Sequence, residues 1–216
     1  MLFDGQANVK GVKVWDRTNG GHYDLQADIV INATGAWAGQ VADMAKASVP
    51  VKPTPGIMVA YDQRLMQRVV NRLCEPDDGD IIIPQRRMMV IGTTSFEVND
   101  VDYIPVADDQ VEQMHRCAYA LIPGLRNTKM RGAYMSARPL IGSGFTGRSL
   151  TRTFKCYDHQ TSEGIKGLVT ITGGKATTCR GMAEKTADLV CQKMGVSATC
   201  QTREFKLVSY REYYRD

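Results

Sequence analysis

The chain has 216 residues, of which 43% are hydrophobic and 23% are charged, and its formal net charge is +4. This composition is ordinary for a folded globular protein and argues against extensive disorder. No apolar run approaches the roughly 20 residues of a membrane-spanning helix, and the first residues show no signal peptide. The basic residues are scattered and their excess is small, so no nucleic-acid partner is expected. These features predict a cytoplasmic protein.

The six cysteines do not form a recognisable framework. No C-x-x-C pair occurs, and the chain has only three histidines. Disulfide scaffolds and zinc sites depend on such closely spaced ligands. Neither a disulfide-stabilised fold nor a metal site is therefore expected.

The first part of the chain is predicted to begin with strands. Residues 9–14 are rich in valine and precede an Asn-Gly-Gly turn, which is typical of a hairpin. Residues 29–31 form a continuous apolar run, which favours a strand covered on both faces in a parallel sheet. A small-residue turn containing Gly35 follows, and residues 37–46 carry a short helical pattern.

The middle of the chain differs in composition. The proline-rich stretch VPVKPTPG marks a boundary near residue 50. Beyond it, alternation and 3.6-residue periodicity predict strands at 57–61, 81–83, 88–93 and 129–134, and helices at 63–73 and 111–122. Asp108 or Asp109 is the expected N-cap of the second helix, and Pro123 and Gly124 end it.

The last part returns to the pattern of the first. Strands are predicted at 153–157 and 168–172, followed by a helix at 177–193 that Gly195 ends. The helix residues expected to be buried are Met182, Ala183, Thr186, Leu189 and Val190.

The predicted fold class is α+β. An α/β unit is formed by residues 1–48 and 141–200, and residues 49–140 form an antiparallel-sheet domain with helices packed on it. Residues 201–216 are a tail or linker.

Two glycine-rich segments invite a nucleotide-binding interpretation. Residues 142–149, GSGFTGRS, contain G-x-G-x-x-G, but a proline precedes them and a strand pattern follows. A dinucleotide fingerprint instead requires a buried strand before it and a helix after it. This segment is therefore interpreted as an ordinary loop.

The segment ITGGKATT is more informative. A strand ends in Gly173 and Gly174, Lys175 follows, and a helix begins shortly afterwards. Unpaired amides at a helix start and the lysine charge suit negative charge on a bound ring system, such as the N1–O2 edge of a reduced flavin. The alternative is a tight strand–helix turn with an exposed lysine. A P-loop is excluded because Ala176 stands where Ser or Thr would hold Mg²⁺.

Arg138 is the second candidate site residue. It precedes Pro139, which favours extended backbone, so its guanidinium could project into a cleft and bind phosphate or carboxylate. A surface or ion-paired arginine is the alternative. Tyr134 lies on the same face if the strand is unbroken.

Four segments resemble, in order, the flavin-dependent glycerol-3-phosphate dehydrogenases, which belong to the FAD oxidoreductases that include D-amino acid oxidase. The matching segments are ADIVINATGAW (27–37), DIIIPQRRMMVIGTTS (80–95), GAYMSARPLIG (132–142) and GLVTITGGKATTCRGMAEKTADLV (167–190). The IGTTS variant and the stretch from DHQTSEG to ITGGK are most similar to the A-type subunit of the anaerobic enzyme.

The resemblance implies hydride transfer from C2 of glycerol 3-phosphate to N5 of FAD, which yields dihydroxyacetone phosphate. Electrons would leave through a quinone-linked chain, with partner subunits and at most peripheral association with the inner face of the cell membrane. Lys175 and Arg138 would be catalytic residues facing the substrate, Arg138 helping to hold its phosphate or hydroxyl groups. The implied cofactor-binding residues are Gly35, Gly173, Gly174, Lys175, Ala176 and Thr177.

Two departures from the family pattern matter. The family's dinucleotide-binding loop would precede Met1, so the chain is expected to begin inside the fold and, alone, to bind FAD weakly or not at all and to be inactive. Met58 stands where related aerobic enzymes carry a histidine. A thioether cannot act as a proton acceptor, so a catalytic base must come from elsewhere.

Two further functions stay open. A flavin oxidase of the same family acting on an amino or hydroxy acid would use Arg138 to bind a carboxylate. A non-enzymatic module that binds a phosphorylated metabolite, or that docks onto partner proteins, would bind its ligand without FAD.

Overall fold

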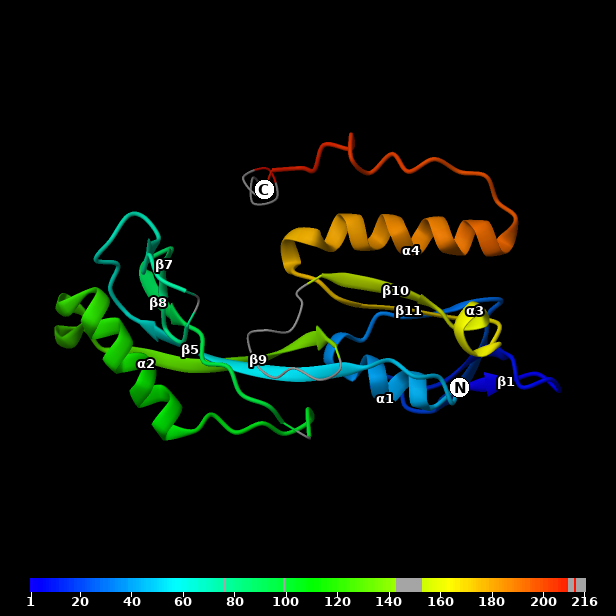
Figure 1. Cartoon of the computed structure of the whole chain (residues 1–216), viewed down its shortest axis with the longest axis horizontal. Coiled ribbons are helices and arrows are strands. Elements are labelled where there is room, and N and C mark those ends of the chain that lie inside the picture. Colours follow the sequence, from blue (N-terminus) through cyan, green and yellow to red (C-terminus); the bar gives the residue numbers. More distant parts are fainter. Residues whose placement is uncertain (76, 99, 143–152, 210–211, 213–216) are drawn as a thin grey trace. The chain divides into compact units, whose positions relative to one another are not determined.

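The computed structural model describes residues 1–75, 77–98, 100–142, 153–209 and 212 (Figure 1). The chain divides into two compact units. Unit 1 comprises residues 1–33, 41–49 and 153–216, and unit 2 comprises residues 34–40 and 50–152. Strands and helices occur together, which confirms the predicted mixed α and β class.

Unit 1 contains two three-stranded sheets. The first has the order β1-β2-β3 and is antiparallel, with β1 at Leu2–Phe3, β2 at Val9–Trp15 and β3 at His22–Gln26. The second has the order β10-β11-β4, with β10 at Phe154–Asp158, β11 at Leu168–Gly173 and β4 at Val30–Asn32. β11 runs parallel to β4 and antiparallel to β10.

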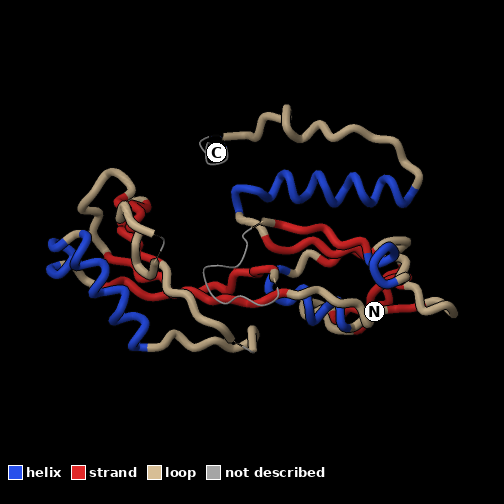
Figure 2. The backbone as a smooth tube through the Cα atoms, viewed as in Figure 1, coloured by secondary structure: helices blue, strands red, loops and turns tan. Residues whose placement is uncertain are grey.

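Apart from α2 (Asp108–Leu121) and η2 (Pro123–Asn127), which are described below with unit 2, the helical segments are short except for the last one, α4. They are η1 (Gly35–Trp37), α1 (Ala38–Asp43), α3 (His159–Glu163), η4 (Ala176–Thr178) and α4 (Cys179–Met194). α4 runs alongside β10 and β11 (Figure 2) and ends at Gly195, which adopts the left-handed conformation of a C-cap.

Two burial predictions for unit 1 are wrong. The side chain of Ile31 is 48% exposed, so the face of β4 on which it lies is not covered. β4 is an end strand of its sheet, with one strand neighbour among the described residues. On α4 only Thr186 is buried, and Ala183 is exposed. Among the described strands, the helix packs mainly on β10 and β11, which cover a narrower stripe than its apolar pattern suggests.

Unit 2 is built on one antiparallel sheet with the order β6-β7-β8-β5-β9. Its strands are β6 (Val70–Asn71), β7 (Ile81–Gln85), β8 (Met88–Gly92), β5 (Val51–Tyr61) and β9 (Met130–Ile141), and its helices are α2 (Asp108–Leu121) and η2 (Pro123–Asn127).

The core of unit 2 lies between this sheet and α2. Alternate residues of each strand point to opposite faces of the sheet, and those on the face toward α2 are buried against the helix. The buried core consists of Ile57, Val59, Tyr61, Ile82, Met89 and Ile91 from the strands, Met114 and Ala118 from α2, and Leu125 from η2. The strand residues next to these in the sequence therefore point to the other face of the sheet, away from α2, where they can line a site.

The predicted helix at 63–73 does not form. The segment is irregular apart from β6, and Leu65, Val69 and Leu73 are exposed, so no apolar face is buried to support a helix. The Arg64 guanidinium instead donates to the backbone carbonyls of Met66, Gln67 and Arg86.

Two boundaries also differ from prediction. The N-cap of α2 is Ala107, which makes no side-chain capping bond, while Asp108 and Asp109 occupy the first turn, where carboxylates favour the helix dipole. β5 begins at Val51 and includes Pro53 and Pro55. Proline is tolerated there because β8 pairs with β5 only from Met58 onward.

Glu163 makes the stability of unit 1 depend on pH. Burial raises the pKa of its carboxyl, but hydrogen bonds from the Ser162 hydroxyl, the Ser48 amide and the His159 ring outweigh burial and hold this pKa below its usual value. A group whose pKa is lower in the folded than in the unfolded state stabilises the fold above the unfolded pKa. That contribution is lost as the pH falls through the folded pKa.

We therefore expect the free energy of unfolding to decrease less steeply between about pH 5 and about pH 3 in Glu163→Gln than in the wild type. Urea denaturation over this pH range measures the effect. Asp188→Asn changes an exposed carboxylate on α4 and serves as the matched control. Equal slopes for wild type and Glu163→Gln would show that this carboxyl does not titrate differently in the folded state.

Candidate functional site

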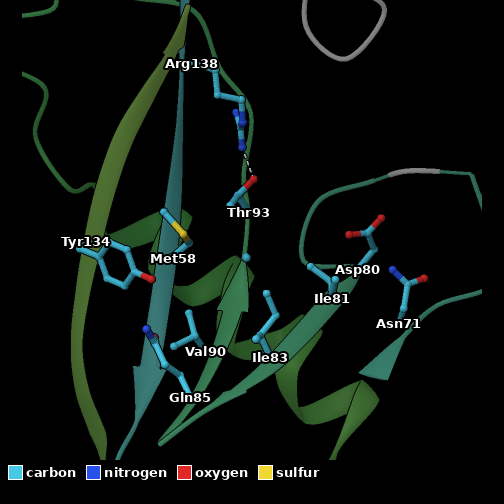
Figure 3. Close-up of a pocket in the computed structure, with 11 residues that line it drawn as sticks. Met58, Asn71, Asp80, Ile81, Ile83, Gln85, Val90, Thr93, Tyr134 and Arg138 are labelled. Atoms are coloured by element: carbon cyan, nitrogen blue, oxygen red, sulfur yellow. Dashed lines mark hydrogen bonds between the residues drawn. The ribbon is translucent and has the colours of Figure 1, made fainter. Parts of the chain in front are cut away.

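A cavity of about 860 Å³ lies on the face of the unit 2 sheet away from α2 (Figure 3). Its apolar wall includes Met58 of β5, Ile81 and Ile83 of β7 and Val90 of β8. Each is a sequence neighbour of a core residue, so strand alternation places it on the cavity face. The polar lining consists of Asn71, Asp80, Gln85, Thr93, Tyr134 and Arg138.

Arg138 lies on β9 and, as predicted, shares the cavity face with Tyr134. Its Nη1 donates to the carbonyls of Thr54 and Pro55 at 3.2 and 3.4 Å, and its Nη2 donates to the Thr94 carbonyl at 3.2 Å and to the Thr93 hydroxyl. These four acceptors are neutral oxygens. They orient the guanidinium on the cavity wall.

Gly56 makes this position of the guanidinium possible. It lies on β5, and a Cβ added there would overlap Arg138 Nη2 and come within 2.5 Å of the Thr94 carbonyl oxygen. The guanidinium therefore crosses β5 over a residue without a side chain. Sequence inspection did not single out Gly56 or Thr93, although Thr93 lies within the IGTTS motif.

Asp80 and Asn71 lie beside each other on another side of the cavity (Figure 3). One carboxylate oxygen of Asp80 accepts from the Asp77 amide at 3.1 Å. The cavity thus combines an oriented guanidinium, an apolar wall and separate groups that can accept or donate hydrogen bonds. Such a lining suits a small organic anion that also carries hydroxyl groups.

The double-glycine corner lies in unit 1, at the end of β11. Gly173 and Gly174 have φ values of 82° and 72°, a left-handed conformation that favours glycine. A Cβ on Gly174 would lie 2.7 Å from the Met182 sulfur and 2.8 Å from Thr178 Oγ1. Both conformation and space therefore require glycine at 174.

The hydrogen bonds of this corner correct one expectation. The Lys175 amide donates to Thr178 Oγ1 at 3.0 Å, and the Thr178 amide donates to the Lys175 carbonyl at 2.9 Å. The corner is thus capped by its own residues, and not all of its amides are unpaired as predicted. The amides of Ala176 and Thr177 take no part in these bonds, and Lys175, Ala176 and Thr177 are exposed.

The remaining predicted positions are placed as follows. Gly35 begins η1 in unit 2 with φ 61°, and a Cβ there would meet nothing within 4 Å, so only its conformation favours glycine. Arg138 is also in unit 2, whereas residues 173–177 are together in unit 1. Of the GSGFTGRS segment, residues 143–149 lie outside the described residues.

Within the described ranges, no group of three His, Cys, Asp or Glu side chains could hold a metal ion. Among the same residues, no helix combines the length and hydropathy needed to cross a membrane.

Comparisons with known proteins agree with one another. The family model described as DAO, FAD dependent oxidoreductase, matches residues 3–189. The chain is 36% identical to the A1-type subunit of anaerobic glycerol-3-phosphate dehydrogenase from Haloferax volcanii, covering 99% of this chain and 38% of that protein. It is 35% identical to the A-type subunit of the Escherichia coli K12 enzyme, covering 95% and 39%. It therefore spans about two fifths of the length of these relatives.

A solved structure points to the same kind of enzyme. The glycerol-3-phosphate dehydrogenase of Bacillus halodurans, determined in complex with FAD, superposes with a TM-score of 0.76 at 26% identity, covering 93% of this chain and 39% of that chain.

Proposed function

The chain belongs to the DAO family of FAD dependent oxidoreductases, and on this basis we propose that it forms part of a dehydrogenase that oxidises sn-glycerol 3-phosphate to dihydroxyacetone phosphate. The observation that carries the proposal is the unit 2 cavity with Arg138 fixed on its wall. The glycerol-3-phosphate dehydrogenases among its relatives support the substrate. Because the chain covers about two fifths of those relatives, the activity belongs to the protein that carries this chain.

Arg138 is the residue to which the phosphate would bind. Its guanidinium already donates to four protein oxygens, which hold it in one orientation before the substrate arrives. A preoriented guanidinium loses little side-chain entropy when it binds an anion. The apolar wall around Met58 and Val90 would contact the carbon chain of the substrate.

In unit 1, the exposed residues after the double glycine fit the edge of an isoalloxazine ring. Ala176 and Thr177 would offer their amides and Lys175 its ammonium group, while the glycines permit close backbone approach. FAD, when bound, would supply the acceptor for the hydride, which carries both electrons. Gly35 is proposed as a further cofactor contact.

The names of two relatives suggest that the protein works with other subunits. Both are A-type subunits of an anaerobic dehydrogenase. We propose that the protein that carries this chain passes its electrons to partner subunits and a quinone, with peripheral membrane association.

The substrate is tested by steady-state reduction of an artificial dye acceptor with the FAD-loaded protein that carries this chain. We expect kcat/KM for sn-glycerol 3-phosphate to exceed that for glycerol by about 100-fold or more, because glycerol lacks the phosphate that pairs with Arg138. We also expect it to exceed kcat/KM for every member of a panel of amino acids. An amino or 2-hydroxy acid oxidised faster than glycerol 3-phosphate would instead establish the oxidase alternative, with Arg138 holding a carboxylate.

A further inference from the structure

We propose that one end of the unit 2 sheet is a docking surface for an anionic lipid bilayer. This surface, the basic end, consists of residues 62–69 after β5, residues 85–88 at the β7–β8 turn, and residues 124–131 from η2 into β9. The loop at 62–69 overlaps the interval 63–73, which the sequence wrongly predicted to be helical.

Hydrogen bonds bring the three segments together. The Arg64 guanidinium donates to the Arg86 carbonyl at 3.0 Å, which ties the loop to the β7–β8 turn. The Asp62 amide donates to the Lys129 carbonyl at 3.0 Å, which ties the same loop to the start of β9. Residues separated by more than 60 positions in the sequence therefore form one surface.

Positive charge is concentrated on this surface. It contains a single carboxylate, that of Asp62, whereas all other residues of the chain together carry 20 cations and 22 carboxylates. The cations of the basic end are Arg64, Arg68, Arg86, Arg87, Arg126, Lys129 and Arg131. The ion pairs within the described ranges involve other residues. The basic residues that look scattered along the sequence are thus partly gathered by the fold.

Apolar side chains stand between these cations. Leu65 and Met66 are each 39% exposed, Val69 is 55% exposed and Met130 is 37% exposed. Along the loop they alternate with arginines in the order Arg64-Leu65-Met66-Gln67-Arg68-Val69. Exposed apolar residues with guanidinium groups around them are the composition of a bilayer-surface segment.

This mixture favours a bilayer over other partners. At a lipid surface, apolar side chains enter the headgroup–acyl boundary while arginines contact the phosphates. A protein interface concentrates its apolar residues in a core depleted of charge, whereas the exposed apolar residues of the basic end adjoin Arg64, Arg68, Lys129 and Arg131 in the sequence. A nucleic-acid site would gain little from exposed Leu, Met and Val.

The test is flotation of the purified chain with vesicles of phosphatidylcholine alone or with about 30% phosphatidylglycerol, a content that gives an anionic surface. The docking surface rests on the peripheral membrane association proposed above. Because neither FAD nor substrate is needed, a failure of this test is distinguishable from a failure of the proposed dehydrogenase activity, which the dye assay measures. We expect partitioning only to the anionic vesicles, weakening as salt rises from about 50 mM to about 500 mM. Arg68→Gln with Arg87→Gln should reduce partitioning about 25-fold, since each cation contributes about fivefold.

Arg17→Gln with Arg203→Gln removes the same charge from exposed residues of unit 1 and should retain most of the wild-type partitioning. Met66→Ser with Val69→Ser should weaken binding while leaving all cations in place. Equal losses in the two arginine pairs, or equal binding to neutral and anionic vesicles, would overturn the proposal. So would binding of polyglutamate or duplex DNA that is lost in Arg68→Gln/Arg87→Gln while vesicle binding persists.

Discussion

Replacing Arg138 by alanine is expected to lower kcat/KM for glycerol 3-phosphate oxidation by about 100- to 1000-fold. Losing one member of a desolvated, hydrogen-bonded charge pair costs about 2–5 kcal/mol, and each 1.4 kcal/mol corresponds to about tenfold. The loss should appear mainly in KM, because the phosphate is bound alike in the ground and transition states. Arg138→Lys keeps a charge but not the fork that contacts Thr54 and Thr94, so its loss should be smaller.

The matched control is Arg116→Ala, which removes an exposed arginine from α2. Its kcat/KM should remain within about twofold of wild type, since surface substitutions usually change free energies by less than about 0.5 kcal/mol. Thermal unfolding of each variant separates lost binding from lost folding. Full activity in a folded Arg138→Ala protein would remove Arg138 from the site.

Gly56→Ala is expected to destabilise unit 2 by about 1–3 kcal/mol and to reduce activity as well. The added Cβ would overlap the Arg138 guanidinium and lie 2.5 Å from the Thr94 carbonyl oxygen. Overpacking of this kind typically costs about 1–3 kcal/mol. The guanidinium is the more movable neighbour, so kcat/KM should fall toward that of Arg138→Ala. Urea denaturation and the dye assay measure the two effects.

Gly132→Ala provides the comparison. Gly132 is a glycine of the neighbouring strand β9 whose added Cβ would meet nothing within 4 Å. It should change stability by less than about 1 kcal/mol, or slightly stabilise the strand, because alanine costs less backbone entropy than glycine. If Gly56→Ala and Gly132→Ala behaved alike, the close approach of Arg138 to β5 would not exist in solution.

The sequence predicted those elements whose conformation is determined by residues close together in the chain. The Gly-Gly pair marked the left-handed corner after β11, and the periodicity of residues 111–122 marked α2. The interval 63–73 shows where local signals fail. Its apolar spacing suits a helix, but Leu65, Val69 and Leu73 are exposed. Arg64 bonds to loop carbonyls instead.

The candidate site could be predicted only in part from the sequence, because most of its contacts join residues that are far apart in the chain. Arg138 was recognisable because Pro139 and the strand pattern place it in extended backbone. Its partners Thr54 and Thr93 are 84 and 45 residues away, and the register that pairs Thr54 with Arg138 is a property of the assembled sheet. The need for glycine at position 56 can be recognised only once that register is known. The capping of the corner by Thr178 likewise depends on side-chain geometry that residue spacing does not reveal.

The most direct measurement is a crystal structure of the FAD-loaded protein that carries this chain, with sn-glycerol 3-phosphate bound. The account predicts the phosphate within hydrogen-bond distance of the Arg138 guanidinium, in the cavity between Met58, Thr93 and Tyr134. A phosphate bound elsewhere, with this cavity occupied only by water, would contradict it.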